Sequence, residues 1–102
     1  MSIDLNTIIR RGDEHIETKV GNQTLMLSAA AGKYFAVESS GQRIWELLKQ
    51  PSSVRSVVSE LQQEYDVSHD RCREEVIAFV SQLVSNGLVE IIPHDALDSH
   101  NP

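Results

Sequence analysis

The sequence predicts an α+β fold in which a three-stranded antiparallel meander precedes a three-helix, winged-helix-like unit that ends in a short C-terminal strand. The hydrophobic pattern supports this order, since its period is two residues before Glu38 and about 3.6 residues after it. Turn residues separate the segments: Gly21-Asn22 and Gly32 divide the first part, while Pro51 and Asn86-Gly87 divide the second. The length of 102 residues fits a single domain.

The chain is expected to consist of one folded domain with two short ends. Residues 1–13 have no sustained hydrophobic period and are predicted to be an N-terminal tether, although Ile8 and Ile9 would suit a short extended piece. Residues 14–92 hold the periodic segments and form the predicted domain. Residues 93–102 are polar and are predicted to form a disordered tail.

A tight hairpin joins the first two strands of the predicted meander. Apolar and polar side chains alternate from His15 to Val20, which predicts a half-buried strand. One of its faces holds Ile16, Thr18 and Val20, and the other holds His15, Glu17 and Lys19. Because Gly21-Asn22 tolerates positive φ, the chain is expected to return through residues 23–29 with Leu25 and Leu27 on the buried face.

The third predicted strand, Lys33 to Glu38, leaves an edge of the sheet open. Phe35 and Val37 share one face of it, and Tyr34 and Ala36 share the other. Only the middle strand of a meander is paired on both sides, and the first strand carries charges that blunt its edge, whereas the third has no charge or proline in its interior. This edge is suited to receive an extended peptide as an added strand. Alternatively, helix packing, the N-terminal segment or a second copy of the protein covers this edge.

Three amphipathic helices are predicted after the meander, each preceded by serine residues that can cap it. The first runs from about Gly41 to Lys49 after Ser39 or Ser40, the second follows Ser52 or Ser53 and reaches Tyr65, and the third follows Ser68 and ends at Asn86-Gly87. The third helix has an apolar stripe formed by Cys72, Val76, Phe79, Val80 and Leu83. Residues 88–92 are rich in β-branched side chains and predict the C-terminal strand.

The charge distribution disfavours nucleic acid and anionic membranes as partners. The formal net charge is −6, and the whole excess lies in residues 51–102, which hold nine acidic and three basic residues. Phosphate groups and anionic lipids are bound by Lys and Arg. In a winged-helix DNA-binding regulator the third helix would enter the major groove, but here it carries Arg71 and Arg73 against Asp70, Glu74 and Glu75. DNA binding therefore stays an alternative only.

The sequence offers no constellation of residues for catalysis, a metal or a cofactor. His69 precedes Cys72 by three residues and could contact it, but a free cysteine on an apolar stripe is usually a small buried hydrophobe. The histidines are scattered along the chain, and no glycine-rich phosphate loop is present. We expect a protein that is not an enzyme and that binds neither a metal nor a cofactor.

A cytoplasmic location is the simplest expectation. Cys72 is the single cysteine, so no internal disulfide can form. The N-terminal residues show no basic segment followed by an apolar one, and no apolar run approaches the roughly 20 residues of a membrane span.

Several segments of the chain resemble the PqqD family of peptide chaperones, which are recognition elements for the precursors of ribosomally synthesised and post-translationally modified peptides. The segments are Gly32-Lys33-Tyr34-Phe35, Gly41 to Leu48, Val54 to Tyr65, Glu75 to Val80, and Gly87-Leu88-Val89. The resemblance spans about residues 13–92. The glycine-lysine-aromatic strand and the Ile44-Trp45 helix start are similar to the stand-alone recognition proteins of lasso-peptide pathways, more than to the protein of pyrroloquinoline quinone synthesis.

This resemblance implies that residues 14–92 hold the leader region of a precursor peptide as an added strand, in a cleft closed by the third helix. The residues it implies for peptide binding are Lys33, Tyr34, Phe35, Ala36, Val37, Arg71, Glu75, Val76 and Phe79. The third strand would supply backbone pairing and an aromatic wall. Val76 and Phe79 would form part of the apolar floor, and Arg71 and Glu75 would select polar groups of the peptide at the rim of the cleft. Alternatively, Val76 and Phe79 are ordinary core residues, and Arg71 is an exposed charge that contacts only solvent.

The implied partners are the precursor peptide and separate maturation enzymes, such as a leader peptidase or a cyclase, to which the bound precursor would be presented. A self-associating structural domain, in which the open edge pairs with a second copy as a homodimer, stays an alternative.

Overall fold

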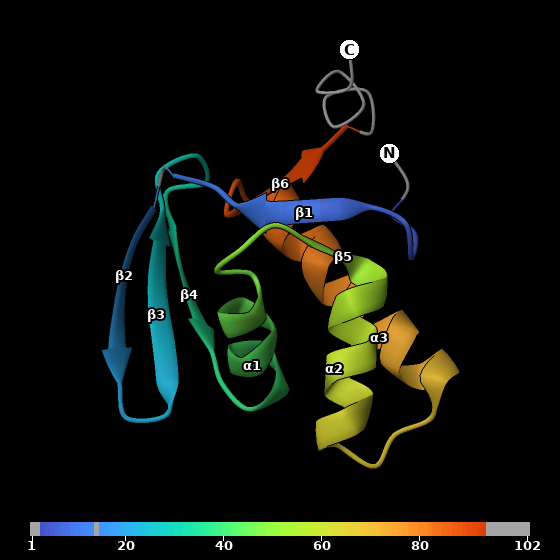
Figure 1. The fold of residues 1–102 in the computed structure, drawn as a ribbon. Coiled ribbons are helices and arrows are strands. Elements are labelled where there is room, and N and C mark those ends of the chain that lie inside the picture. The colour runs from blue at the N-terminus through green and yellow to red at the C-terminus, as the bar shows by residue number, and fades with distance from the viewer. Residues whose placement is uncertain (1–2, 14, 94–102) are drawn as a thin grey trace.

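The structure is a computed structural model and describes residues 3–13 and 15–93. Strands and helices follow one another in the order β1 (Ile8–Arg11), β2 (His15–Val20), β3 (Gln23–Ser28), β4 (Lys33–Val37), α1 (Ser40–Leu47), β5 (Ser52–Ser53), α2 (Val54–Glu64), α3 (His69–Ser85) and β6 (Val89–Ile92) (Figure 1). The predicted α+β class, with its meander, three helices and C-terminal strand, is confirmed. The predicted tail over 93–102 lies outside the described residues except for Pro93.

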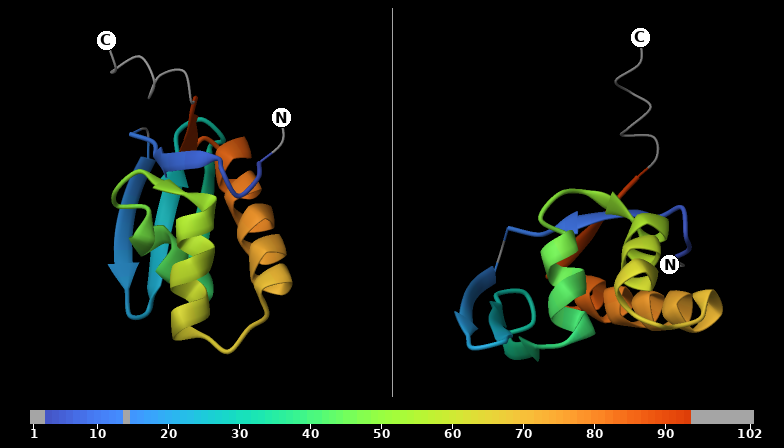
Figure 2. Two further views of the ribbon diagram at one scale, coloured as in Figure 1. Left: turned by 45° about the vertical axis from the view of Figure 1, so that its right-hand side comes forward. Right: turned by 60° about the horizontal axis from the view of Figure 1, so that its bottom comes forward.

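The strands form two antiparallel sheets that lie on different sides of the helices. One is the predicted meander, in the order β2-β3-β4, and the other has the order β5-β1-β6. In Figure 1 the meander stands upright beside α1, while β1 crosses above the helices. Figure 2 shows α1 between the meander on one side and α2 with α3 on the other. The first helix therefore lies between the meander and the two longer helices.

The N-terminal segment contains the short extended piece expected at Ile8 and Ile9, but it differs from the predicted tether because β1 lies at the centre of the second sheet. Its residues Ile8 and Ile9 pair with β5 as well as with Ile92 and Ile91 of β6, and Ile9 is fully buried. The pairing partners lie more than 40 residues away in the sequence. A local hydrophobic period therefore could not show that this short segment is a strand.

The helix boundaries follow the predicted caps with one exception. Ser53 and Ser68 accept hydrogen bonds from the backbone N–H groups of Ser56 and Arg71, as an N-cap residue does. Gly87 ends α3 with a φ of 74°, in the left-handed region. Ser39, at the start of α1, makes no side-chain capping bond and has a φ of 56°, a conformation that favours glycine.

The meander turns the opposite face to the core from the one that the apolar pattern predicts. Leu25 and Leu27 are only half-buried, whereas the alternate residues Thr24, Met26 and Ser28 are buried. In β2, likewise, Ile16, Thr18 and Val20 are exposed. The polar residues of β3 can be buried because tertiary hydrogen bonds satisfy them: Thr24 Oγ1 lies 2.6 Å from Gln42 Oε1, and Ser28 Oγ donates to the Asn86 carbonyl.

A polar cluster around Glu17 joins the meander to α1 and β1. The indole Nε1 of Trp45 donates to Glu17 Oε2 at 2.9 Å, and Trp45 is 1% exposed. Arg11 Nη1 lies 3.4 Å from Glu17 Oε1, its side chain also donates to the Trp45 carbonyl, and its guanidinium lies 4.2 Å from the centroid of the indole ring. His15 Nε2 lies 3.3 Å from Glu17 Oε1. One carboxylate thus holds groups from three elements.

The cluster favours the charged form of this carboxylate. Burial acts to raise the pKa of Glu17, but hydrogen bonds from Trp45 and His15, together with the charge of Arg11, outweigh it and lower the pKa below its ordinary value. The carboxylate form therefore contributes stability above the ordinary pKa of 4.5, and this contribution is lost as the pH falls through the folded-state pKa.

We expect Glu17→Gln to lower the free energy of unfolding by about 1 kcal/mol at neutral pH, because bonds to a charged acceptor are stronger than bonds to an amide, while solvent screens this 35% exposed side chain. Chemical denaturation measures the difference. The difference should shrink as the pH falls below 4.5, since protonation makes the wild type resemble the variant.

Glu90→Gln is the matched control, because Glu90 pairs with Arg10 at 2.9 Å on the surface, where both side chains are more than half exposed. It should change stability by less than about 0.5 kcal/mol. A Glu17→Gln variant as stable as the wild type at neutral pH would show that the cluster does not hold the meander in place.

Candidate functional site

The predicted open edge of the meander is present at β4. Within the described residues, β4 pairs with β3 from Ser28↔Lys33 to Thr24↔Val37 and has no strand on its other side. Along β4, Phe35 is half-buried and Val37 buried, while Tyr34 and Ala36 are exposed. The backbone groups on the open side of β4 are thus available to a further strand, with no charged side chain between Lys33 and Glu38.

A mostly apolar hollow of about 480 Å³ begins where β4 ends. It lies among the three helices and is lined by Ser39, Ser40, Gly41, Ile44, Leu61, Tyr65, Val67, Cys72, Glu75, Val76 and Phe79. Tyr65 is 44% exposed, so the wall of the hollow reaches the surface of the molecule. Its size and its lining suit apolar side chains of a bound ligand.

Phe79 of α3 connects this hollow with the edge strand. A Cβ atom built on Gly41 would lie 3.3 Å from Phe79 Cζ and 3.7 Å from Val37 Cβ. The first turn of α1 can therefore approach α3 closely, because residue 41 has no side chain. The end of β4, the start of α1 and the middle of α3 meet at this point.

The charged residues predicted for the rim form a pair on α3. Arg71 Nε lies 3.3 Å from Glu75 Oε1, one helical turn away, and both side chains are more than half exposed. Glu75 lines the hollow, so the pair lies beside its mouth. An exposed pair of this kind contributes little to stability, and its carboxylate and guanidinium can exchange partners with a ligand.

Cys72 lines the hollow and is 3% exposed. Burial, with a smaller contribution from the charge of Glu75, raises the pKa of its thiol, and Sγ lies 3.8 Å from the Val58 carbonyl. A thiol with a raised pKa is mostly protonated at neutral pH and is a poor nucleophile. Its surroundings are those of a packing residue.

The structure brings some of the predicted site residues together and separates others. Glu75, Val76 and Phe79 line the hollow, and Val37 and Phe79 both lie within 4 Å of the Cβ position of Gly41. Tyr34 and Ala36 are on the face of the meander that points away from the helices, and Lys33 lies at the far end of β4.

Sequence reasoning missed the walls that α1, α2 and the segment after α2 contribute to the hollow: Ile44, Leu61, Tyr65 and Val67. For Tyr65 the available signal was an aromatic residue at the end of the apolar spacing of the second helix. For the others none was available, because apolar helix residues that face a hollow have the same spacing as those that face the core.

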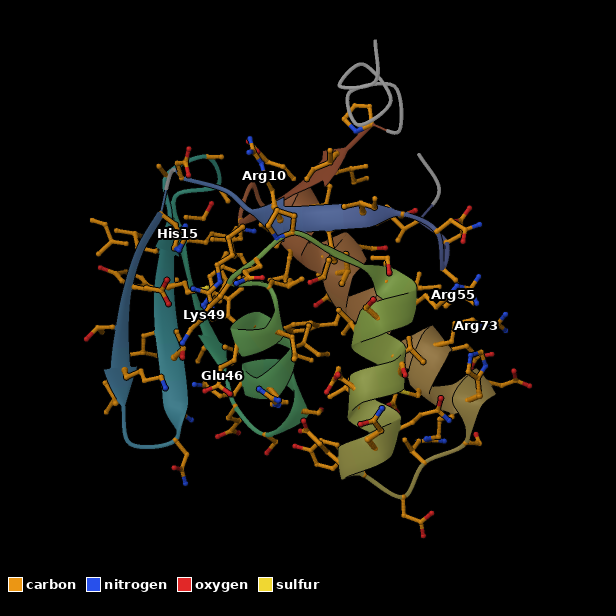
Figure 3. All side chains as sticks on the ribbon, viewed as in Figure 1. Arg10, His15, Glu46, Lys49, Arg55 and Arg73 are labelled. Carbon is orange, nitrogen blue, oxygen red and sulfur yellow. The ribbon has the colours of Figure 1, made fainter. Side chains whose placement is uncertain are left out.

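A larger hollow, of about 570 Å³, lies on another side of the molecule. It is formed by residues 3–6 with Arg55, Arg73, Glu74, Ile77 and Ala78, none of which belongs to β4 or adjoins it in the chain. Arg55 and Arg73 are seen in Figure 3 on the side of the molecule away from the meander. The smaller hollow is the better candidate site, because it continues an edge that can pair with a ligand backbone.

The described residues offer two further findings on chemistry and location. They contain no group of three or more His, Cys, Asp or Glu side chains that could hold a metal ion. None of the helices in this part of the chain is long and apolar enough to span a membrane.

The structure resembles two solved complexes. One is TbiB1 in complex with the TbiA(beta) leader peptide, with a TM-score of 0.72 and 23% identity, covering 79% of this chain and 94% of TbiB1. The other is lasso peptide synthetase B1 complexed with the leader peptide, with a TM-score of 0.70 and 22% identity, covering 83% of this chain and 98% of the synthetase chain. These likenesses show a shared fold.

The sequence itself matches a known family. No curated protein matches the chain. The family of coenzyme PQQ synthesis protein D (PqqD), however, matches residues 23–89, which include β3, β4 and all three helices. The chain therefore belongs to the PqqD family.

Proposed function

We propose that this protein binds the leader region of a ribosomally synthesised precursor peptide by strand addition to β4 and presents the precursor to separate modifying enzymes. The observation that supports this most is the uncharged, open β4 edge beside an apolar hollow. The family membership and the two leader-bound complexes of the same fold are consistent with it.

The geometry allows two kinds of recognition at once. A strand added at the usual spacing of about 4.8 Å would form backbone hydrogen bonds to β4, whatever its sequence. Alternate side chains of the added strand would point to the helix side, toward Phe79 and the hollow. Backbone pairing would thus supply affinity, and apolar side chains spaced by two residues would supply specificity.

In this proposal the protein contributes no chemical step. The thiol of Cys72 is buried with a raised pKa, and the described residues hold no candidate metal cluster. Instead, the protein raises the effective concentration of the core peptide. An enzyme that binds near the captured leader encounters the attached core peptide at an effective concentration that the linking segment sets.

The proposed role of the hollow is tested by Phe79→Ala. Removal of the ring takes away apolar surface shared by the hollow and the β4 edge, so the affinity for a leader peptide should fall at least about tenfold. Fluorescence anisotropy with a labelled leader peptide that the wild type binds measures the change; the TbiA(beta) leader is the first probe.

Ile77→Ala is the matched control for this substitution. Ile77 is also a partly buried apolar residue of α3, but it lines the hollow on the other side of the molecule. Its substitution should change leader affinity by less than about twofold. Equal losses in the two variants would point to a general effect on α3 and contradict a role for the hollow.

Strand addition is tested by proline at two neighbouring positions, Phe35→Pro and Ala36→Pro. Successive N–H groups of an edge strand point alternately to the paired neighbour and to the open side. One variant therefore loses a bond to β3 and stability, and the other loses a donor on the open side.

Thermal denaturation identifies the variant that keeps its stability, and that variant should bind the leader at least about tenfold more weakly than the wild type. If it binds with unchanged affinity, the peptide does not pair with β4.

A further inference from the structure

The outer face of the meander, which points away from the helices, is apolar, and no other described segment covers it. Ile16 is 71% exposed, Val20 56% and Tyr34 79%. The strand register places Ile16, Leu27 and Tyr34 in one row across the three strands. Thr18, Leu25 and Ala36 form the next row. A continuous exposed apolar surface on a small soluble protein often marks a site of interaction with a partner.

The charged side chains of β2 point to the other side of the sheet. Glu17 binds Trp45, and Lys19 Nζ lies 3.4 Å from Glu46 Oε2 on α1. Because successive side chains alternate between the two faces of a strand, the residues between them are on the outer face. This face therefore has no charged residue in its two rows, although the chain has a net charge of −6.

A shallow hollow of about 370 Å³ lies at one end of this face. Ile16, Leu27 and Ala29 contribute apolar walls, and Asp13 and His15 complete it. An apolar side chain of a partner could enter it beside the first row, which would fix the position of the partner along the strands.

We propose that this outer face docks the maturation enzyme that acts on the leader-bound precursor, through an uncharged apolar surface of that enzyme. This inference rests on the function proposed above. The partner chemistry follows from the face itself, since an uncharged apolar surface is matched by another of the same kind and penalises unpaired charges.

Continuity with the β4 edge favours an enzyme that acts on the precursor. A leader strand added to β4 would place every second side chain on the outer face, beside Tyr34 and Ala36. The face would then consist of four strands, one of them from the substrate. A partner docked there would contact the protein and the leader together, so each would raise the affinity of the other for the enzyme.

A second copy is the less favoured occupant of the same face. Two copies carry like net charges of −6, which repel each other on approach.

The test is Ile16→Glu, a substitution on β2, the strand farthest from the β4 edge. A charge at this exposed position should leave the fold and the leader affinity unchanged. Gln63→Glu, which adds the same charge at an exposed site on α2, is the matched control. Circular dichroism verifies that both variants fold, and anisotropy measures their leader affinity.

Biolayer interferometry then measures binding of a purified leader peptidase or cyclase that modifies the leader-bound precursor, with and without leader peptide. We expect the leader to tighten enzyme binding to the wild type at least about fivefold, Ile16→Glu to weaken it at least about tenfold, and Gln63→Glu to change it less than about twofold. Sedimentation velocity of the wild type alone should show a monomer.

Unchanged enzyme binding by Ile16→Glu would overturn the inference, and so would a wild-type dimer that Ile16→Glu dissociates. If the wild type binds the enzyme in an Ile16-dependent way but does not bind the leader, the docking face is supported and the proposed leader-binding function is the part that fails.

Discussion

The attachment of the meander to α1 is the contact on which the rest of the structure depends. The Glu17 carboxylate binds the indole of Trp45 and lies within reach of Arg11 and His15, so a single acidic side chain ties β2 to β1 and α1. Together with the bonds of Thr24 to Gln42 and of Ser28 to Asn86, these bonds hold one face of the meander against the helices. They thereby place the open β4 edge beside α3 and leave an apolar face toward solvent.

The local structure could be predicted from the sequence because its causes are local. Gly21, Gly32 and Gly87 adopt the positive φ values that their turns require, and Ser53 and Ser68 cap the two longer helices. The open third strand was also predictable, since a meander has only two edges and charged residues occupy one of them. The predicted residues Glu75, Val76 and Phe79 do come together at one hollow.

The features that sequence reasoning missed have distant causes. The buried side of β3 could not be chosen from its pattern, because Thr24 and Ser28 are satisfied by Gln42 and Asn86, far along the chain. The strand β1 owes its conformation to pairing with β6. In both cases the local hydrophobic pattern does not determine the environment of the segment. Partners far along the chain decide whether a polar group can be buried and whether a short segment can pair as a strand.

The central claim is that a leader peptide becomes the fourth strand of the meander, and amide hydrogen exchange monitored by NMR tests it most directly. Upon saturation with the leader, alternate backbone amides between Lys33 and Val37 should become strongly protected, and cross-strand contacts between leader and β4 protons should appear. A leader that binds while the exchange of every β4 amide stays unchanged, with protection appearing on other elements, would contradict the account.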